Sequence, residues 1–159
     1  MATKIEFEVS YSQLVVFTSE LRQPYNDWTD QHVAQGFAWR PGSVSFRTVS
    51  QVGPHSVEIA VVDQTGAVCP DAIRALEVPF TVPTNGAIEI GSITQTVPLF
   101  LPAGLYLLRC EFLQPIVADD AQVRLIFAKA EAPRFAVVRA DPELSINGEL
   151  LTIAQPAPG

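Results

Sequence analysis

The chain has 159 residues, of which 48% are hydrophobic and 17% are charged, and its formal net charge is −7. This length fits one domain with an adequate core, and the apolar content excludes intrinsic disorder. The acidic balance argues against binding to nucleic acids or anionic membranes, because both attract basic surfaces. No apolar run reaches the roughly 18 residues of a membrane helix, and the N-terminus lacks the apolar centre of a signal peptide, so we expect a cytoplasmic protein.

The first residues of the chain alternate between apolar and polar side chains. Ile5, Phe7 and Val9 alternate with Glu6 and Glu8, which predicts a strand with one buried and one solvent-facing side. Similar runs, separated by turn sequences, predict further strands at residues 13–17, 44–48, 57–62, 76–82, 87–90, 94–100, 105–112, 122–128 and 135–139. This pattern indicates an all-β fold class: a single-domain antiparallel β-sandwich over residues 1–153, with a flexible tail at 154–159.

Three positions carry more specific predictions about these strands. Pro79 has no backbone N–H to donate, so it predicts an edge position or a bulge. Asn85-Gly86 favours a tight hairpin turn between the strands on either side of it. Asn147-Gly148 could likewise close a terminal hairpin formed by residues 144–146 and 149–153.

One short helix is expected near residues 29–36. Thr29 is a favourable N-cap, Asp30 places an acid in the first turn, and Gly36 suits the residue that ends a helix. Trp28 and Trp39 bracket this segment. Their aromatic side chains either plug an open end of the sandwich or form a recognition surface.

The residue types that usually carry catalysis are scarce in this chain. His32 and His55 are the two histidines, and neither lies in a recognisable hydrolase motif, so we expect surface or loop positions for both. No phosphate-binding glycine motif and no Cys/His cluster for zinc occurs. Cys69 and Cys110 are expected to be free structural thiols. The sequence therefore predicts a protein that is not an enzyme and needs no metal or cofactor.

The candidate binding residues are acids and one aromatic in or beside predicted loops, namely Asp27, Trp28, Asp30, Asp119 and Asp120. Acidic side chains around an aromatic anchor suit a basic protein partner. Loop aspartates could instead bind calcium, although their spacing matches no EF-hand loop. A structural interpretation is also open, with Asp30 at the start of the helix and Asp119 in a turn.

Three blocks of sequence, in this order, carry a family resemblance. They are residues 26–38 (NDWTDQHVAQGFA), 78–93 (VPFTVPTNGAIEIGSI) and 101–110 (LPAGLYLLRC). Together with residues 41–46 (PGSVSF), they make the chain similar to the competence protein J family over roughly residues 10–128. The best-known members of that family bind and inhibit a DNA-entry nuclease of competent cells. Residues 132–159 extend beyond the resemblance.

The resemblance implies a non-catalytic protein that binds and blocks a basic nuclease. An acidic inhibitor is physically sensible, because nucleases present basic clefts to phosphates and carboxylates can match that charge. Two alternatives remain open at this stage. One is a calcium- or ligand-binding β-sandwich module, and the other is an interaction domain that dimerises through its terminal hairpin.

Overall fold

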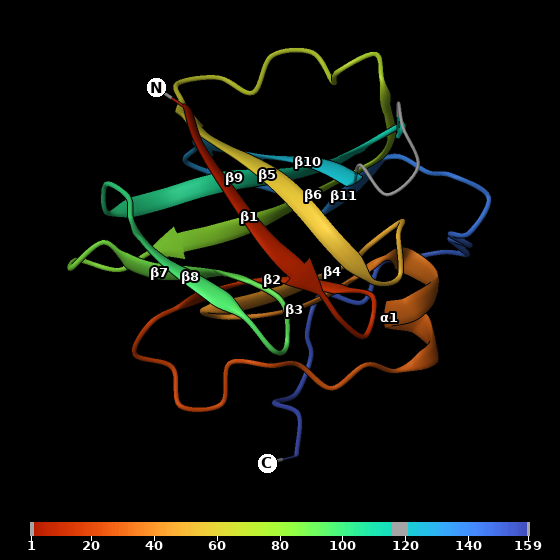
Figure 1. Cartoon of the computed structure of the whole chain (residues 1–159), viewed down its shortest axis with the longest axis horizontal. Helices are drawn as coiled ribbons and strands as arrows, with labels where there is room; N and C mark the ends of the chain where they lie inside the picture. The colour runs from red at the N-terminus through yellow and green to blue at the C-terminus, as the bar shows by residue number, and fades with distance from the viewer. Residues whose placement is uncertain (1, 116–120, 159) are drawn as a thin grey trace.

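The computed structural model describes residues 2–115 and 121–158, which form eleven strands, one short helix and the loops between them. The strands make two sheets packed face to face (Figure 1). Sheet A has the order β1 (Ala2–Val9), β5 (Gly53–Val62), β10 (Ala121–Lys129), β9 (Gly104–Leu113), β6 (Ala72–Val82) and β11 (Ala136–Arg139). Sheet B has the order β3 (Phe37–Arg40), β4 (Ser43–Arg47), β2 (Gln13–Thr18), β7 (Ala87–Gly91) and β8 (Thr96–Phe100). Helix α1 (Asp30–Gln35) directly precedes β3.

The predicted fold class, an all-β sandwich with one short helix, is confirmed. Neighbouring strands pair antiparallel, except that β10 runs parallel to β5, with Val123 opposite Val57. That parallel pair lies in the middle of sheet A, where both strands are shielded from solvent by their neighbours. Within the described residues, no helix has the length and apolar character needed to cross a membrane.

The core lies between the two sheets and is built from alternate residues of each strand. On β9, the side chains of Tyr106, Leu108, Cys110 and Phe112 point inward and are buried, as the alternation predicts. Phe127 on β10 meets the Tyr106 ring edge-on, with the ring centroids 5.9 Å apart. Burial of such apolar area is the main force that holds the two sheets together.

The predicted hairpin at Asn85-Gly86 is wrong. A tight turn does form there, because Gly86 adopts a φ of 73° and its N–H donates to the Pro83 carbonyl. However, β6 before the turn belongs to sheet A and β7 after it belongs to sheet B. The turn therefore carries the chain from one sheet to the other, and β7 pairs with β2 and β8 instead of β6.

The edge position predicted for Pro79 is confirmed for its own part of β6, although the strand as a whole lies between β9 and β11. Strand β6 pairs with β9 along its whole length, whereas β11 pairs with β6 only from Ala75 to Glu77. Pro79 lies beyond the end of β11, so its missing N–H costs no ladder hydrogen bond on that side. Its carbonyl accepts a 2.7 Å hydrogen bond from the indole N–H of Trp39.

A layer of irregular chain covers the outer face of sheet B. Residues 19–29 run beneath this sheet together with the C-terminal segment (Figure 1). Asn26 fixes the layer, since its amide nitrogen donates to the Ala38 carbonyl at 2.9 Å and its amide oxygen accepts from Arg40 at 2.7 Å. The Ser43 hydroxyl donates to the Pro24 carbonyl as well. This layer places Asp27, Trp28 and α1 at fixed positions relative to the sheet.

The C-terminal segment after β11 forms a strap across the molecule, and the predicted terminal hairpin is wrong. Residues 140–158 contain no strand, and their hydrogen bonds to the rest of the described chain go to α1, to residues 25–27 and to Arg47 and Arg74. The Ala157 N–H, for example, donates to the Tyr25 carbonyl at 2.8 Å. Ala154 is buried in this strap. The flexibility of the tail at 154–159 stays a prediction. A dimer joined through a terminal hairpin has no structural basis here, because residues 140–158 form no strands that could pair.

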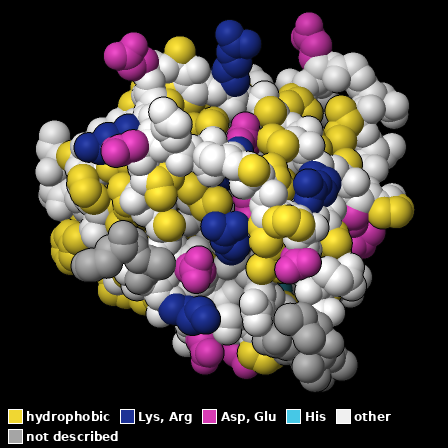
Figure 2. Space-filling view, turned by 90° about the horizontal axis from the view of Figure 1, so that it is seen from above, with side chains coloured by type: hydrophobic (Ala, Val, Ile, Leu, Met, Phe, Trp, Pro, Cys, Tyr) yellow, Lys and Arg dark blue, Asp and Glu magenta, His cyan; other side chains and the backbone are white. Residues whose placement is uncertain are grey.

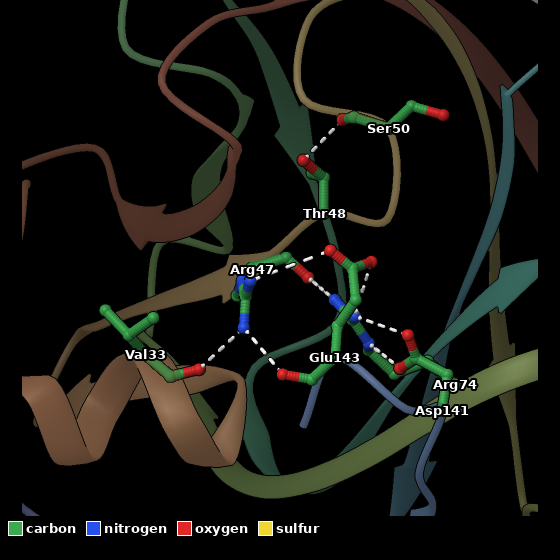
Figure 3. A network of polar contacts seen from close by, with 7 residues as sticks. All are labelled: Val33, Arg47, Thr48, Ser50, Arg74, Asp141 and Glu143. Carbon is green, nitrogen blue, oxygen red and sulfur yellow. Dashed lines mark hydrogen bonds and ion pairs between the residues drawn. The ribbon is translucent and has the colours of Figure 1, made fainter. Parts of the chain in front are cut away.

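A buried arginine ties the strap to the sandwich (Figure 3). Arg74 on β6 is completely buried, and its guanidinium forms a two-pronged ion pair with Asp141 at 2.6 and 3.0 Å. The same guanidinium donates to the Arg47 carbonyl on β4 at 2.6 Å. Glu143 lies 3.5 Å from Arg74 and 3.7 Å from the Arg47 guanidinium. One network therefore joins sheet A, sheet B and the strap.

The outer face of sheet A carries balanced charge. Glu111 on β9 is fully buried between Arg109 at 3.4 Å and Arg124 at 3.0 Å, and Glu77 also pairs with Arg109. Seen from above, basic and acidic side chains are interspersed on this face with hydrophobic ones between them (Figure 2). The described residues of this face therefore offer no extended acidic surface to a basic partner.

Candidate partner-binding site

The site is organised by α1, whose ends are set by its own sequence. The Thr29 hydroxyl accepts the His32 N–H at 3.4 Å, while the Thr29 N–H donates to His32 Nδ1 at 3.0 Å, so the two residues cap the helix reciprocally. Gly36 ends the helix in the left-handed region with a φ of 94°. Both predicted ends are confirmed.

Asp27 and Asp30 lie exposed on either side of Trp28 and Thr29. Asp30 occupies the first turn of α1, where the helix dipole favours a negative charge. The backbone N–H of Asp27 donates to the Gln155 carbonyl at 2.8 Å, which holds its side chain at the surface. Neither carboxylate forms an ion pair or a side-chain hydrogen bond with another described residue. Both charges are therefore available to a partner.

Trp28 lies half-buried against the start of α1, with its ring edge-on to His32 at a centroid distance of 6.3 Å. It lines a surface hollow of about 290 Å³, together with Tyr11, Ser12, Gln13, Val33 and Arg47. The indole N–H is covered and has no hydrogen-bond partner among the described residues. The aromatic residues around α1 were expected either to pack against the sandwich or to form a recognition surface. Trp39 and Phe37 pack, since both contact the Phe135 ring. Trp28 borders an open hollow instead.

The remaining two candidates, Asp119 and Asp120, lie outside the described residues. The alternative hypothesis of a calcium site relied partly on these two aspartates. Among the residues that the structure does describe, no group of three His, Cys, Asp or Glu side chains is placed to hold a metal ion.

The expectation that both histidines lie on the surface or in loops is wrong. His32 is buried in α1, and because its Nδ1 accepts the Thr29 N–H, its Nε2–H donates to the Ile153 carbonyl at 3.0 Å. His55 is buried within β5, where Nδ1 donates to the Gly53 carbonyl at 3.1 Å. Burial lowers the pKa of His55. Both side chains serve the fold.

The two cysteines are free, as predicted. Cys110 lies in the core, and its burial raises the pKa of the thiol well above its ordinary value. A thiol that stays protonated is a poor nucleophile, so Cys110 acts as a packing residue.

The structure adds one acid to this region that sequence reasoning missed. Glu149 in the strap is exposed, and its backbone carbonyl accepts from the Gln31 side chain at 3.0 Å. Glu149 and Asp30 border the same hollow between α1 and the strap. We call Asp27, Asp30 and Glu149 the acidic face. No local signal joins Glu149 to α1, because more than a hundred residues separate them along the chain.

A family model for competence protein J (ComJ) matches residues 6–129 of the chain. The chain belongs to the competence protein J family. It is 32% identical over 106 residues to a DNA-entry nuclease inhibitor of Bacillus subtilis (strain 168), an alignment that covers 66% of this chain and 77% of that relative.

Two solved structures share the family's fold. The crystal structure of ComJ, inhibitor of the DNA-degrading activity of NucA, from Bacillus subtilis, superposes with a TM-score of 0.66 at 24% identity, covering 80% of this chain and 96% of that one. Crocagin biosynthetic gene J superposes with a TM-score of 0.54 at 14% identity, covering 79% and 96%. The match to the competence protein J model ends at Lys129, so β11 and the strap lie outside it.

Proposed function

We propose that this member of the competence protein J family is a non-catalytic, cytoplasmic protein that binds a basic DNA nuclease and blocks it. The observation that carries the proposal is the acidic face, on which the carboxylates of Asp27, Asp30 and Glu149 are exposed beside α1. In a family with a named nuclease inhibitor, such a face is suited to the basic surface that a nuclease offers to DNA.

The physical basis is charge complementarity. A nuclease must attract phosphates, so its substrate cleft carries positive potential. Carboxylates that enter this field speed association and compete with DNA for the same surface. Exposed charges are screened by salt, so the complex should form more slowly as ionic strength rises.

The proposal is tested by titrating the purified protein into NucA of Bacillus subtilis while DNA degradation is followed. We expect inhibition that weakens between about 50 mM and 500 mM salt, since the Debye length shrinks over this range. A lack of inhibition at every salt concentration, with no complex detected by calorimetry, would contradict the proposal.

The acidic face itself is tested with the double variant Asp27→Asn/Asp30→Asn. We expect its association rate with NucA at low salt to fall roughly threefold to tenfold, because two steering charges are lost. The matched control is Asp63→Asn/Glu131→Gln, which removes the same charge from exposed acids outside the acidic face. Equal rates for the two double variants would show that only net charge matters.

A further inference from the structure

The hollow beside Trp28 is bordered by a strained turn. Tyr11 and Ser12, which join β1 to β2, both have a φ of 56°, a left-handed conformation that residues other than glycine rarely adopt. Hydrogen bonds hold the turn there: the Ser12 N–H donates to the Gln51 carbonyl at 3.1 Å, and the Thr48 N–H donates to the Ser12 carbonyl at 2.9 Å. The Tyr11 side chain, 74% exposed, is thereby displayed at the rim. Strain that the surroundings maintain in this way often marks a functional site.

Helix α1 contributes an apolar side chain to the rim of the hollow. Val33 projects from α1 and is 40% exposed. Arg47 lies in the wall, where its guanidinium donates to the Val33 and Glu143 carbonyls at 3.1 Å each and pairs with the Glu143 carboxylate. Because these contacts occupy Arg47, the described residues that line the hollow include no free cation for a phosphate or carboxylate ligand.

Two residues that line the hollow each carry a covered polar atom that has no hydrogen-bond partner among the described residues. Three buried side-chain nitrogen or oxygen atoms of the described residues have no hydrogen-bond partner, and two of them are Trp28 Nε1 and Gln13 Oε1. One is a donor and the other an acceptor. A peptide group offers the complementary pair, a carbonyl oxygen and an N–H. Small side-chain rotations, which are common when interfaces form, would turn both atoms toward such a group.

We infer that the hollow formed by Tyr11, Gln13, Trp28 and Val33 is the anchor site for a loop of a basic protein partner. The loop places one apolar or aromatic side chain between Tyr11 and Val33, and its backbone bonds to Trp28 and Gln13. The size of the hollow, about 290 Å³, lies at the lower limit of pockets for small molecules, which supports a single inserted side chain. Asp27, which directly precedes Trp28, supplies the charge that favours a basic partner. This inference rests on the proposed function, because the partner is the nuclease.

The anchor is tested by measuring the affinity of NucA for two variants, Tyr11→Ala and Phe100→Ala. The two rings are exposed to nearly the same extent, 74% and 77%, but Phe100 lies on the edge strand β8 and does not line the hollow. We expect Tyr11→Ala to weaken binding at least about tenfold, as truncation of an aromatic hot-spot residue does, and Phe100→Ala to change it less than about twofold. Neither variant opens a core cavity, so both should fold.

Trp28→Phe tests the hydrogen bond separately, because it keeps an aromatic ring and removes the indole N–H. We expect roughly fivefold weaker binding, with the far-ultraviolet circular dichroism unchanged. Val33→Asp should weaken binding more strongly, because it puts a charge into the apolar rim.

The outcomes separate this inference from the proposed function. If the wild-type protein binds NucA and Tyr11→Ala binds equally well, the anchor site is wrong and the proposed function stands. If the wild-type protein neither binds nor inhibits NucA, the proposed function is overturned and the anchor site with it. Equal losses for Tyr11→Ala and Phe100→Ala would also overturn the anchor site, because they would indicate a general effect of lost aromatic surface.

Discussion

At the scale of single residues, burial determines the protonation state of His55. Its ring lies inside β5, with Nδ1 bonded to the Gly53 carbonyl and Nε2 covered and unpaired among the described residues. Desolvation lowers its pKa, although the backbone bonds to Gly53 and Pro54 and the charge of Glu8 oppose the shift. The folded protein thus favours the neutral ring, while the unfolded chain takes up a proton near pH 6.5.

This difference predicts an acid-sensitive stability. The contribution from His55 is fully present above about pH 6.5 and is lost as the pH falls from there toward the lowered pKa of the folded state. We expect the free energy of unfolding, measured by urea denaturation, to decrease between pH 7.5 and pH 5.5. In His55→Asn, whose amide can replace the Nδ1 donor, the decrease should be smaller. An unchanged slope in the variant would show that other groups cause the effect.

At the scale of elements, α1 depends on the glycine that ends it. A Cβ on Gly36 would lie 3.2 Å from Leu144 Cδ2 and 3.3 Å from Leu76 Cδ1, in addition to the strain of its φ of 94°. We expect Gly36→Ala to lower the free energy of unfolding by about 1–2 kcal/mol from backbone strain and more from crowding. Gly148→Ala is the control, because its φ is 81° and no atom lies within 4 Å of the added Cβ. Equal thermal shifts in the two variants would exclude the crowding.

The same elements show what could be predicted from the sequence. Side-chain alternation and the helix caps are local properties, so the strands and the ends of α1 were predicted close to their observed positions. The short strand β3 was missed because four residues give too little periodicity. The Asn85-Gly86 turn was correctly placed, but whether its flanking strands share a sheet depends on contacts far along the chain. The parallel pairing of β5 with β10 has the same non-local origin.

Part of the candidate site could be predicted from the sequence, and part of it depends on the fold. Asp27, Trp28 and Asp30 are adjacent in sequence, and their acidic and aromatic character was visible there. Tyr11 and Gln13 join them only in the folded protein, because β2 must first pair with β4 and the layer of residues 19–29 must cover sheet B. The burial of His55 was missed because the strand was predicted to begin at residue 57, whereas β5 already begins at Gly53.

At the scale of the whole molecule, stability depends on how the strap is fastened. The ion pair of Arg74 with Asp141 joins the strap to both sheets, and Arg74 also lies over the Phe112 ring at 5.8 Å. Burial alone would raise the pKa of Asp141, but the hydrogen bond and charge of Arg74 outweigh it, so the pKa is lowered. The stabilisation is therefore present above about pH 4 and is lost as the pH falls through the lowered pKa.

Removing the charge of Asp141 should leave the buried guanidinium without its close ion pair, because the remaining carboxylate, Glu143, lies 3.5 Å away and is partly exposed. We expect Asp141→Asn to lower the free energy of unfolding by about 3–5 kcal/mol, as loss of one partner from a buried ion pair does. Glu143→Gln should cost less than about 1 kcal/mol, because that carboxylate is 45% exposed and its ion pairs are long, at 3.5 and 3.7 Å. Hydrogen exchange gives a second readout: in Asp141→Asn, the strap amides of Ser145, Leu151 and Ala157 should lose protection before the core strands do. Uniform loss of protection across strap and sandwich would mean that the strap is part of the cooperative fold and no separate element.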